Sequence, residues 1–560
     1  MNNNIRTAIA AVLSMVVLVV WQFYFDKAAP QKEIVNSNNV GIDFNSENNK
    51  EAEATHPISR KTIIETSMND NNRVVFNNGV IKGSINLVGA KIDDLVLLKY
   101  KNTIKKGSED VVLLSPAKTK EVYYAEFGWL STDKNLDMPD NKTVWASDKK
   151  YITSSEKLNL RWENKQGIEF TIKIGLDENY LFHIEQKAVG NGSSSIKFYS
   201  GISRSGNDIQ EGQMLIHEGA IGVFNDKLEE ITFEKLSDKK SVKFEDQNGG
   251  WFGFSDKYWL TAIISKDSNL NSKFSEQKYG NGKRYQATGI IDNNKIDNNI
   301  SYNEVLFFAG AKELKLLDEY EKQYNIKLFD RAVDFGILYF ITKPIFLALN
   351  FLYSLCGNFG IAIILLTVFI KFLLFPLAYK GFKGMNKLKE LQPEMERMKK
   401  LYDNDSAKMQ KGIIELYKKE KVNPMSGCLP IILQMPVFFA LYKVLYVTLE
   451  MRHAKFFWWI KDLSAIDPTN IFTAFGLINW DPPSFLLVGV LPIIMALTMY
   501  LQQRLNPQPS DPTQAKVMKL LPVIFLFMFA SFPSGLVLYW SWSNILSITQ
   551  QVLIKRLTKK

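Results

Sequence analysis

The feature that most constrains this 560-residue chain is the separation of its polar and apolar residues into two halves. Residues 27–325 are rich in Asn, Lys, Asp and Ser, whereas residues 328–556 are dominated by Leu, Ile, Phe, Val, Met and Pro. A helix of about 20 apolar residues is long enough to cross a bilayer. The separation therefore predicts a water-exposed domain joined to a polytopic α-helical membrane domain.

Six apolar segments are candidates for membrane-spanning helices. The first lies in residues 1–26, where Arg6 precedes an apolar run that ends in aromatic residues, as is typical of a membrane interface. We interpret it as an uncleaved anchor, because the run lacks the small-residue site at which a signal peptide, the alternative, is cleaved. The other five segments cover about 357–377, 428–449, 485–501, 517–532 and 535–554.

Positive charge between these segments predicts their orientation. The loop 379–427 and the end of the chain are densely basic, whereas the loop 450–484 is much less so. Basic loops stay on the cytoplasmic side of a membrane. We therefore expect both termini in the cytoplasm and the large polar domain outside, in a periplasm-like space.

The polar half divides into a linker and a β domain. Residues 27–60 are polar throughout and predict a linker with little core. Residues 61–325 alternate apolar and polar residues between Asn, Gly and Asp turns, as in "RVVFNNGVIKGSINLVGAKI", which favours a large β-sandwich. We expect its His183 and His217 to face solvent on strands and its Trp251 to pack in the core.

Two amphipathic regions flank the second apolar segment. Residues 326–356 mix apolar residues with charges and Pro344, which favours a helix lying at the outer membrane interface over a seventh span. Within the membrane core, residues 357–560, the region 379–424 repeats apolar residues at spacings of three and four. That repeat predicts a cytoplasmic hairpin of two antiparallel helices whose basic face meets anionic lipid, ribosomes or client chains.

The sequence lacks the motifs of several enzyme classes. It contains no phosphate-binding G-x-x-x-x-G-K-[ST] loop, no G-x-S-x-G and no H-E-x-x-H. The net charge of +10 is not organised as a basic helix with interleaved aromatic residues. We therefore expect no catalytic residue, no metal, no cofactor and no nucleic-acid or small-molecule substrate.

One lysine lies within an apolar segment. Lys371 is in the middle of "LLTVFIKFLLFPL", and Lys380, the next basic residue, is roughly 13 Å away along a helix. A charge at the centre of a bilayer costs about 2.5–3.5 kcal/mol, and no carboxylate in the apolar segments is available to pair with it. Snorkelling to the cytoplasmic surface is one explanation, and a water-filled recess is the other. Uncharged polar residues in the same segment and in two others favour the recess: Thr367, Gln434, Ser541, Ser543, Asn544, Thr549 and Gln550.

Several motifs together resemble the YidC-type membrane protein insertases of Gram-negative bacteria. The matching stretches are "GNFGIAIILLTVFIKFLLFPL", "LQPEMERMKKLY", "YKKEKVNPMSGCLPIILQMPVFFALYKVL", "DLSAIDP", "LPVIFLFMFASFPSGLVLYW" and "SNILSITQQVLI". The resemblance implies a five-helix insertase core with a hydrophilic groove, and an outer β-super-sandwich of the sugar-mutarotase type. It implies an insertase and chaperone that does not hydrolyse ATP, acts alone or with the Sec translocon, and serves nascent membrane proteins. Ribosomes are expected at the cytoplasmic hairpin and the basic C-terminal tail.

The resemblance also assigns roles to residues. Lys371 matches the basic residue of the groove, which is usually Arg in the family, and Thr367 and Gln434 match groove-lining positions. Ser541 and Asn544 are expected to line the same groove. Four further residues match positions that contact clients or form an aromatic pair on the sixth span: Met435, Pro436, Tyr539 and Trp540.

Two other functions fit parts of the sequence. A secondary transporter of a small anion would use Lys371 as its binding charge, but it predicts inverted repeats, which the five-segment core does not show. A carbohydrate-binding domain on a passive anchor would leave the polar residues of the apolar segments and the basic hairpin unexplained.

Overall fold

The computed structural model describes residues 57–558 with several gaps. The gaps are residues 132, 134, 192, 194–195, 207–215, 280–281, 292–298, 337, 403–405, 421–428, 479, 481, 484–485 and 507–511. The predicted anchor in residues 1–26 and nearly all of the predicted linker, residues 27–60, lie outside the described residues. The described chain divides into two compact units. One, the β unit, extends to Gly336 and includes Val447–Glu450, and the other, the helical unit, contains the remaining residues.

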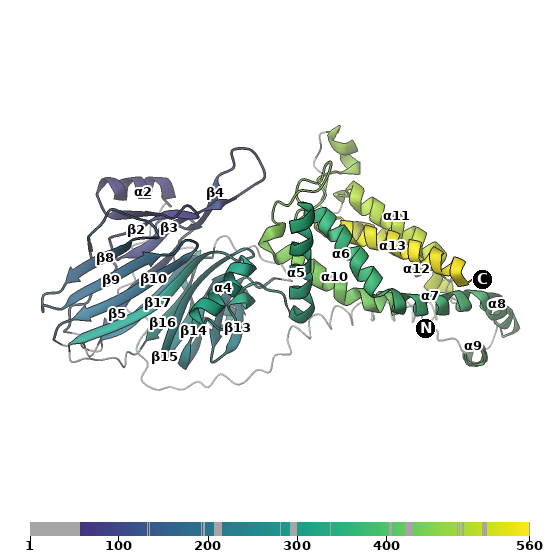
Figure 1. Ribbon diagram of the computed structural model, residues 1–560, viewed down its shortest axis with the longest axis horizontal. Helices are drawn as coiled ribbons and strands as arrows, with labels where there is room; N and C mark the ends of the chain where they lie inside the picture. The colour runs from purple at the N-terminus through teal and green to yellow at the C-terminus, as the bar shows by residue number, and fades with distance from the viewer. Residues whose placement is uncertain are drawn as a thin grey trace. The chain divides into compact units, whose positions relative to one another are not determined.

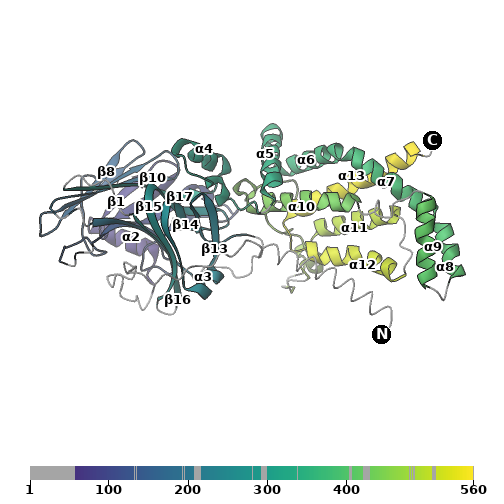
Figure 2. The same ribbon diagram turned by 90° about the horizontal axis from the view of Figure 1, so that it is seen from below.

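The β unit is built from two sheets that share two long strands (Figures 1 and 2). The described residues form seventeen strands. Sheet A contains β1 (Arg73–Asn77), β2 (Ile81–Asn86), β3 (Lys91–Lys101), β4 (Asp110–Leu114), β5 (Tyr123–Ser131), β7 (Tyr151–Ile152), β11 (Ile196–Ser205) and β16 (Gly282–Ile291). Sheet B contains β6 (Ala146–Ser147), β8 (Lys157–Glu163), β9 (Glu169–Leu176), β10 (Leu181–Val189), β12 (Gly219–Phe224), β13 (Lys227–Thr232) and β17 (Ile300–Ala311).

The shared strands are β14 (Ser241–Ser255) and β15 (Trp259–Tyr279), which pair with each other along most of their length. The first part of β15 pairs with β17 of sheet B, and its second part pairs with β16 of sheet A. Register shifts in the β14–β15 ladder lie between these two parts, and such irregularities let a strand bend from one sheet into another. The predicted β-rich domain is confirmed.

Aromatic side chains from the two sheets meet in edge-to-face contacts and form the core. Phe127 of β5 contacts Phe307 of β17, with ring centroids 5.9 Å apart, although these strands do not pair. Trp129 of β5 contacts Phe170 of β9 in the same way. Trp251 is fully buried and its indole N–H donates to the carbonyl of Lys327, so the expectation that it packs in the core is confirmed.

His217 differs from its predicted position. The sequence led us to expect a solvent-facing strand residue, but only 8% of it is exposed. Its ring Nε2 lies 3.0 Å from the carbonyl oxygen of Ala220, and its backbone N–H donates to Asp334. Asp334 is 117 residues away in the chain, and a local alternation pattern does not report such a contact.

Among the described residues, the β unit also contains the helices α2 (Arg60–Asn69), α3 (Phe233–Lys239) and α4 (Leu314–Tyr324) and the 3-10 turn Phe329–Ala332. Helix α4 lies within the stretch "GAKELKLLDEYEKQY". Its Glu321 accepts hydrogen bonds from the backbone N–H groups of Phe329 and Asp330, which fixes the segment that follows.

A buried ion pair joins three strands of sheet A. Arg73 of β1 donates from both terminal nitrogens to the carboxylate of Asp93 on β3, at 2.7 and 3.1 Å. The guanidinium also donates to Ser84 of β2, whose hydroxyl donates to Asp94. The side chains of Arg73 and Asp93 are almost completely excluded from water, so each charge depends on the other.

The helical unit contains nine helices in its described residues. They are α5 (Tyr339–Cys356), α6 (Phe359–Leu373), α7 (Phe375–Glu390), α8 (Gln392–Leu401), α9 (Ser406–Lys419), α10 (Leu429–Val447), α11 (Val490–Leu505), α12 (Pro512–Phe529) and α13 (Ser534–Thr558). Helix α13 packs against α6, α7 and α11. It is therefore the central helix of the unit.

The predicted apolar segment 357–377 is not one straight helix. Helix α6 ends at Leu373, and α7 begins at Phe375 after a bend of 67°. Pro376 accounts for the break, because proline has no N–H to continue the helical ladder and its ring clashes with the preceding turn. The bend lies three residues after Lys371 and places it at the end of a helix.

The predicted cytoplasmic hairpin has three helices where we expected two. The first arm is divided between α7 and α8 at Leu391, and Pro393 lies in the first turn of α8. Helices α8 and α9 then pack against each other, and the hydroxyl of Tyr417 donates to the sulfur of Met395. The seam between the arms is therefore present, and Pro393 explains the additional break.

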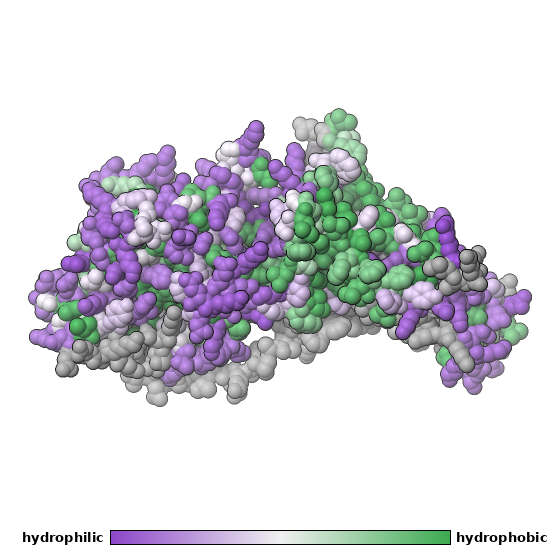
Figure 3. Space-filling view, viewed as in Figure 1, coloured by the Kyte–Doolittle hydropathy of each residue, from purple (hydrophilic) through white to green (hydrophobic). Residues whose placement is uncertain are grey.

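Few helices in the described residues meet a strict criterion for crossing a membrane. Helix α5 is long and apolar enough by itself, and the bent pair α6–α7 would be a second span if it crosses as one. The apolar part of α10, Gln434–Val447, is shorter. The six-span count therefore stays a prediction. Hydrophobic side chains cover much of the visible surface of the helical unit over α5 and α6 (Figure 3).

We expect Asp93→Asn to destabilise the β unit by about 3–5 kcal/mol, because the asparagine leaves the buried guanidinium of Arg73 without its counter-charge. Hydrogen exchange of the slowest β-unit amides in the full chain measures this change. Asp110→Asn is the matched control, since its partner Lys101 is half-exposed, and we expect a loss of at most about 1 kcal/mol. Equal losses at both positions would contradict the importance of burial.

The stability of the β unit should also fall on acidification because of His217. Burial lowers the pKa of His217 to about 4, well below its ordinary value of 6.5, and nearby Asp334 only partly opposes this effect. The unfolded chain therefore binds a proton at a pH where the folded chain does not, and stability decreases as pH falls from 6.5 to 4. We expect His217→Gln to flatten this part of the stability curve by up to about 3 kcal/mol. Hydrogen exchange at a series of pH values tests the difference, and parallel curves for the two proteins would contradict it.

Candidate functional site

The candidate site is built around the end of α6. Asn358 caps the start of this helix by accepting hydrogen bonds from the N–H groups of Gly360 and Ile361. Apolar residues fill most of the helix, and Lys371 is its single basic residue, located in the last turn. A cation is favourable there, because the carbonyl end of a helix carries partial negative charge.

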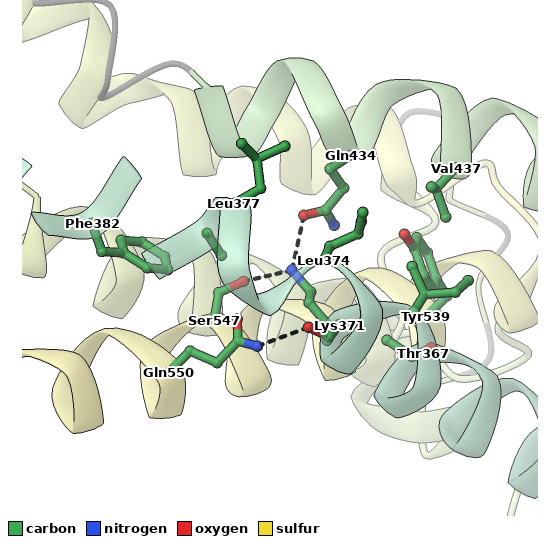
Figure 4. Close-up of a pocket in the computed structure, with 12 residues that line it drawn as sticks. Thr367, Lys371, Leu374, Leu377, Phe382, Gln434, Val437, Tyr539, Ser547 and Gln550 are labelled. Atoms are coloured by element: carbon green, nitrogen blue, oxygen red, sulfur yellow. Dashed lines mark hydrogen bonds between the residues drawn. The ribbon is translucent and has the colours of Figure 1, made fainter. Parts of the chain in front are cut away.

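The ammonium group of Lys371 connects three helices (Figure 4). It donates to the side-chain oxygen of Gln434 on α10 at 3.1 Å and to the hydroxyl of Ser547 on α13 at 2.7 Å. The amide of Gln434 donates in turn to the hydroxyl of Ser543 at 2.5 Å. Lysine carries three donors and no acceptor, so these oxygens suit it.

A second contact to α13 stabilises the helix break. The side-chain amide of Gln550 donates to the main-chain carbonyl of Lys371 at 3.2 Å (Figure 4). The chain bends directly after this turn, so carbonyl groups at the end of α6 need hydrogen-bond donors from outside the helix. Gln550 provides one, and the lysine is held through both its backbone and its side chain.

The lysine lies in an open recess among α6, α7, α10 and α13, which we call the Lys371 recess. Among the described residues that line it, none is acidic. Its lining consists of Thr367, Ile370, Lys371, Leu374, Leu377, Ala378, Phe382, Gln434, Val437, Tyr539, Ser547 and Gln550. The recess therefore presents one cation with neutral acceptors on mainly apolar walls, a combination that attracts anionic groups.

The expected groove-lining residues fall into two groups. Thr367 and Gln434 line the recess with Lys371. Ser541 and Asn544 are buried elsewhere on α13: the hydroxyl of Ser541 donates to the carbonyl of Val537 in its own helix. Asn544 donates to Thr498 of α11 and so joins these two helices.

The residues expected to contact clients also divide. Tyr539 lines the recess and is 2% exposed, whereas Trp540 points to an aromatic cluster with Phe438 of α10 and Phe529 of α12. Met435 and Pro436 follow Gln434 on α10 and are partly buried without lining the recess. The aromatic cluster joins α10, α12 and α13 beside the recess.

Our assignment from sequence missed two contacts that hold the lysine. Ser547 did not appear among the polar candidates, and Gln550 appeared without an assigned role. A signal was present, because Ser543, Ser547 and Gln550 are spaced by four and three residues and therefore lie on one face of a helix. The same spacing excludes Ser541 from that face.

Comparisons with known proteins agree with this architecture. The model of the 60Kd inner membrane protein family matches residues 351–560, and that of the YidC periplasmic domain matches residues 73–348. The membrane protein insertase YidC of Rickettsia bellii is 46% identical over the full length of both chains. The chain belongs to the YidC family. The YidC of Rickettsia akari is 46% identical over 99% of this chain and all of its own.

A solved structure is also similar. It is a crystal structure of an active YidC insertase with its first transmembrane domain resolved, and it is 17% identical, with a TM-score of 0.35. The match covers 86% of this chain and 92% of that chain. The family assignment rests on the full-length identity to the relatives and on the two family models.

Two serines on α13, Ser547 and Ser541, differ in their hydrogen-bond partners. Ser547→Ala removes an acceptor from the Lys371 ammonium, whereas Ser541→Ala removes only a bond within its own helix. We expect Ser547→Ala to reduce the free energy of unfolding by about 1.5 kcal/mol, since hydrogen bonds to charged groups contribute at least that much. We expect Ser541→Ala to change it by less than about 0.5 kcal/mol. Chemical unfolding in detergent, followed by circular dichroism, compares them, and equal effects would contradict the assignment.

Proposed function

We propose that the protein is a membrane protein insertase and chaperone that inserts, folds and helps assemble inner-membrane proteins through the Lys371 recess. It acts alone or with the Sec translocon and without hydrolysing ATP. The observation that carries the proposal is an ammonium group on α6, held by residues of two other helices, in an open recess whose described lining contains no acidic residue. Membership of the YidC family supports the same function.

The recess would assist the polar part of a client. A client with a hydrophilic acidic loop must bring that loop part-way across an apolar layer, which is costly for charged groups. A fixed cation offsets part of this cost: at roughly 12 Å and an effective dielectric constant of about 20, the attraction to one carboxylate is about 1.4 kcal/mol. Lys371 acts as a point charge, so it attracts carboxylates without the two-pronged geometry that arginine imposes.

The apolar part of the client would follow a different path. We assign it to the surface formed by α10 and α12, where Met435 and Pro436 lie near the aromatic cluster around Trp540. Tyr539 adjoins both regions, because it lines the recess next to Trp540 in sequence. The polar and apolar parts of a client thus have separate surfaces on neighbouring helices.

The placement in the membrane follows from the charge pattern and the arrangement of helices. Helix α5 meets the length criterion for a span but runs crosswise to α11 and α13 in both views (Figures 1 and 2). If α11 and α13 cross the bilayer, α5 lies along its outer interface. We therefore propose six spans, the first in residues 1–26, with both termini in the cytoplasm and the β unit in the periplasm.

The partners follow from the same orientation. The basic helices α7, α8 and α9 and the basic C-terminal tail would face the cytoplasm, where anionic lipid headgroups and ribosomal RNA carry negative charge. Nascent membrane proteins are the clients. No catalytic residue, cofactor, metal or small-molecule substrate is part of the proposal.

The role of the charge is tested by insertion of a two-span client with an acidic translocated loop, in cells depleted of the native insertase. We expect Lys371→Met to lower the initial insertion rate by about tenfold, which corresponds to about 1.4 kcal/mol, because the attraction is lost. Lys371→Arg should retain most of the activity. A client with a neutral loop should depend much less on the residue.

Lys443→Met is the matched control. It removes the same charge from an apolar helix, α10, but its side chain does not line the recess. We expect it to insert the acidic client at close to the normal rate. If Lys371→Met supports insertion as well as this control does, the groove charge is not needed. Uptake of a labelled anion by the purified protein would instead favour a transporter.

A further inference from the structure

The loop between α10 and α11 is anchored firmly at one end of the helical unit. Its backbone is hydrogen-bonded to the start of α13: Gly535 donates to Leu463 and Ser534 donates to Ala465. Phe456 packs so closely on Gly360, at the start of α6, that a Cβ on the glycine would overlap the ring. The base of the loop therefore lies at the end of the unit where α6 and α13 begin.

The start of α11 is held by the same loop. Asp467 is buried and accepts a hydrogen bond at 2.8 Å from the N–H of Leu491, in the first turn of α11. Gly489 leaves the room for this carboxylate, because a Cβ there would lie 2.5 Å from it. Three helices are thus tied to one loop, and the position of the loop is coupled to theirs.

Apolar side chains project from this anchored base. Leu477 is 88% exposed and Trp458 is 84% exposed. The segment Thr469–Trp480 contains no charged residue. Several further large apolar residues of the loop are more than a third exposed: Phe457, Ile466, Ile471, Phe472, Phe475, Ile478, Trp480 and Leu487. An uncharged exposed patch of this size indicates an interaction surface.

The backbone is strained where it presents these side chains. Trp458, Ala474 and Phe475 have φ angles of 56°, 47° and 59°, in the left-handed region that residues other than glycine rarely adopt. Such conformations persist only where the surrounding structure requires them, and they concentrate at functional segments. Two of these residues, Trp458 and Phe475, carry aromatic side chains that are mainly exposed.

The loop lies at the same end of the unit as the exposed face of α5. Helix α5 is followed by Gly357 and then by α6, whose first turn contacts the loop through Phe456. Near this end, α5 exposes Leu355 by 69% and Phe351 by 64%. The segment containing the 3-10 turn Ile471–Gly476, drawn in light green, projects from this end in Figure 1 and carries hydrophobic surface at its tip in Figure 3.

We propose that Trp458, residues 471–478 and Trp480 insert into the boundary between headgroups and acyl chains of the outer leaflet, as a second interfacial anchor beside α5. The inference rests on the membrane placement in the proposed function. Tryptophan, phenylalanine and aliphatic residues without charge are the composition that this boundary favours. Exposed Lys455 and Lys461 at the base of the loop suit lipid phosphates.

The lipid surface fits this patch better than a client segment or a second copy of the chain. The indole N–H of Trp480 already donates to the carbonyl of Phe472, so this polar group is not available to recognise a protein partner. The patch also lies at the same end of the unit as the exposed face of α5. This arrangement favours an extended lipid surface that contacts both α5 and the loop.

The anchor would fix the depth of the Lys371 recess. Helix α10 leads directly to this loop, and Gln434 lies 13 residues before its last residue, Val447, which is roughly 20 Å along a helix. Holding the outer ends of α10 and α11 at the interface keeps Gln434, and the lysine bonded to it, at a constant distance from the outer surface.

Depth-dependent quenching tests the proposal in the full chain. Cys356 and Cys428 are replaced by serine, one cysteine is introduced by Leu477→Cys and labelled with an environment-sensitive fluorophore, and single copies are placed in lipid nanodiscs without client. We expect lipids with a nitroxide high on the acyl chain to quench the label strongly, and lipids with the nitroxide near the chain end to quench it less. Both effects follow from a shallow insertion.

Two further labelled positions separate the possible outcomes. Val523→Cys on the exposed face of α12 reports a spanning helix, and Lys105→Cys reports an exposed loop of the β unit. Quenching at Val523 without quenching at Leu477 overturns the anchor and leaves the membrane placement intact. Absence of quenching at both positions overturns the placement itself. Quenching at Leu477 that appears only after a client is added assigns the patch to clients and also overturns the anchor.

Discussion

The contact on which the helical unit depends is that between the Lys371 ammonium and the oxygens of Gln434 and Ser547. A charge at this point of an apolar helix is tolerated because neutral acceptors from two other helices hold it beside an open recess. A carboxylate in place of either acceptor would pair with the lysine and reduce its attraction for other anions. The same bonds that stabilise the cation therefore leave its charge available, and stability and function rest on one arrangement.

The break between α6 and α7 makes this arrangement possible. Pro376 ends the helical ladder just after Lys371, and Gln550 bonds the carbonyl of the lysine at the bend. The bend turns α7 toward α13, where Phe382 and Met385 pack with Ile554. A straight helix would continue past the recess without enclosing it. The proline is thus a structural requirement of the site, although it does not line the recess itself.

In the β unit, local sequence patterns predict the strands but not the contacts between residues that are distant in sequence. Alternation of apolar and polar residues predicted many strands and a β-rich domain, because each strand of a sandwich buries one face. It did not predict that β14 and β15 bend from one sheet into the other, or that His217 is buried and bonded through its backbone to the distant Asp334. Both features depend on residues that are distant in sequence, and they decide which groups are buried.

The sequence by itself determined the division into a polar β half and an apolar helical half, the unusual position of Lys371, and the membership of its motifs in an insertase family. These properties are local, since they depend on composition, periodicity and short motifs. The tertiary structure decided which polar residues surround the lysine: Ser547 and Gln550 face it, whereas Ser541 and Asn544 do not. That choice depends on the rotation of α13 against α6 and α10. Helix rotation is set by packing across the whole unit, and residue types alone do not specify it.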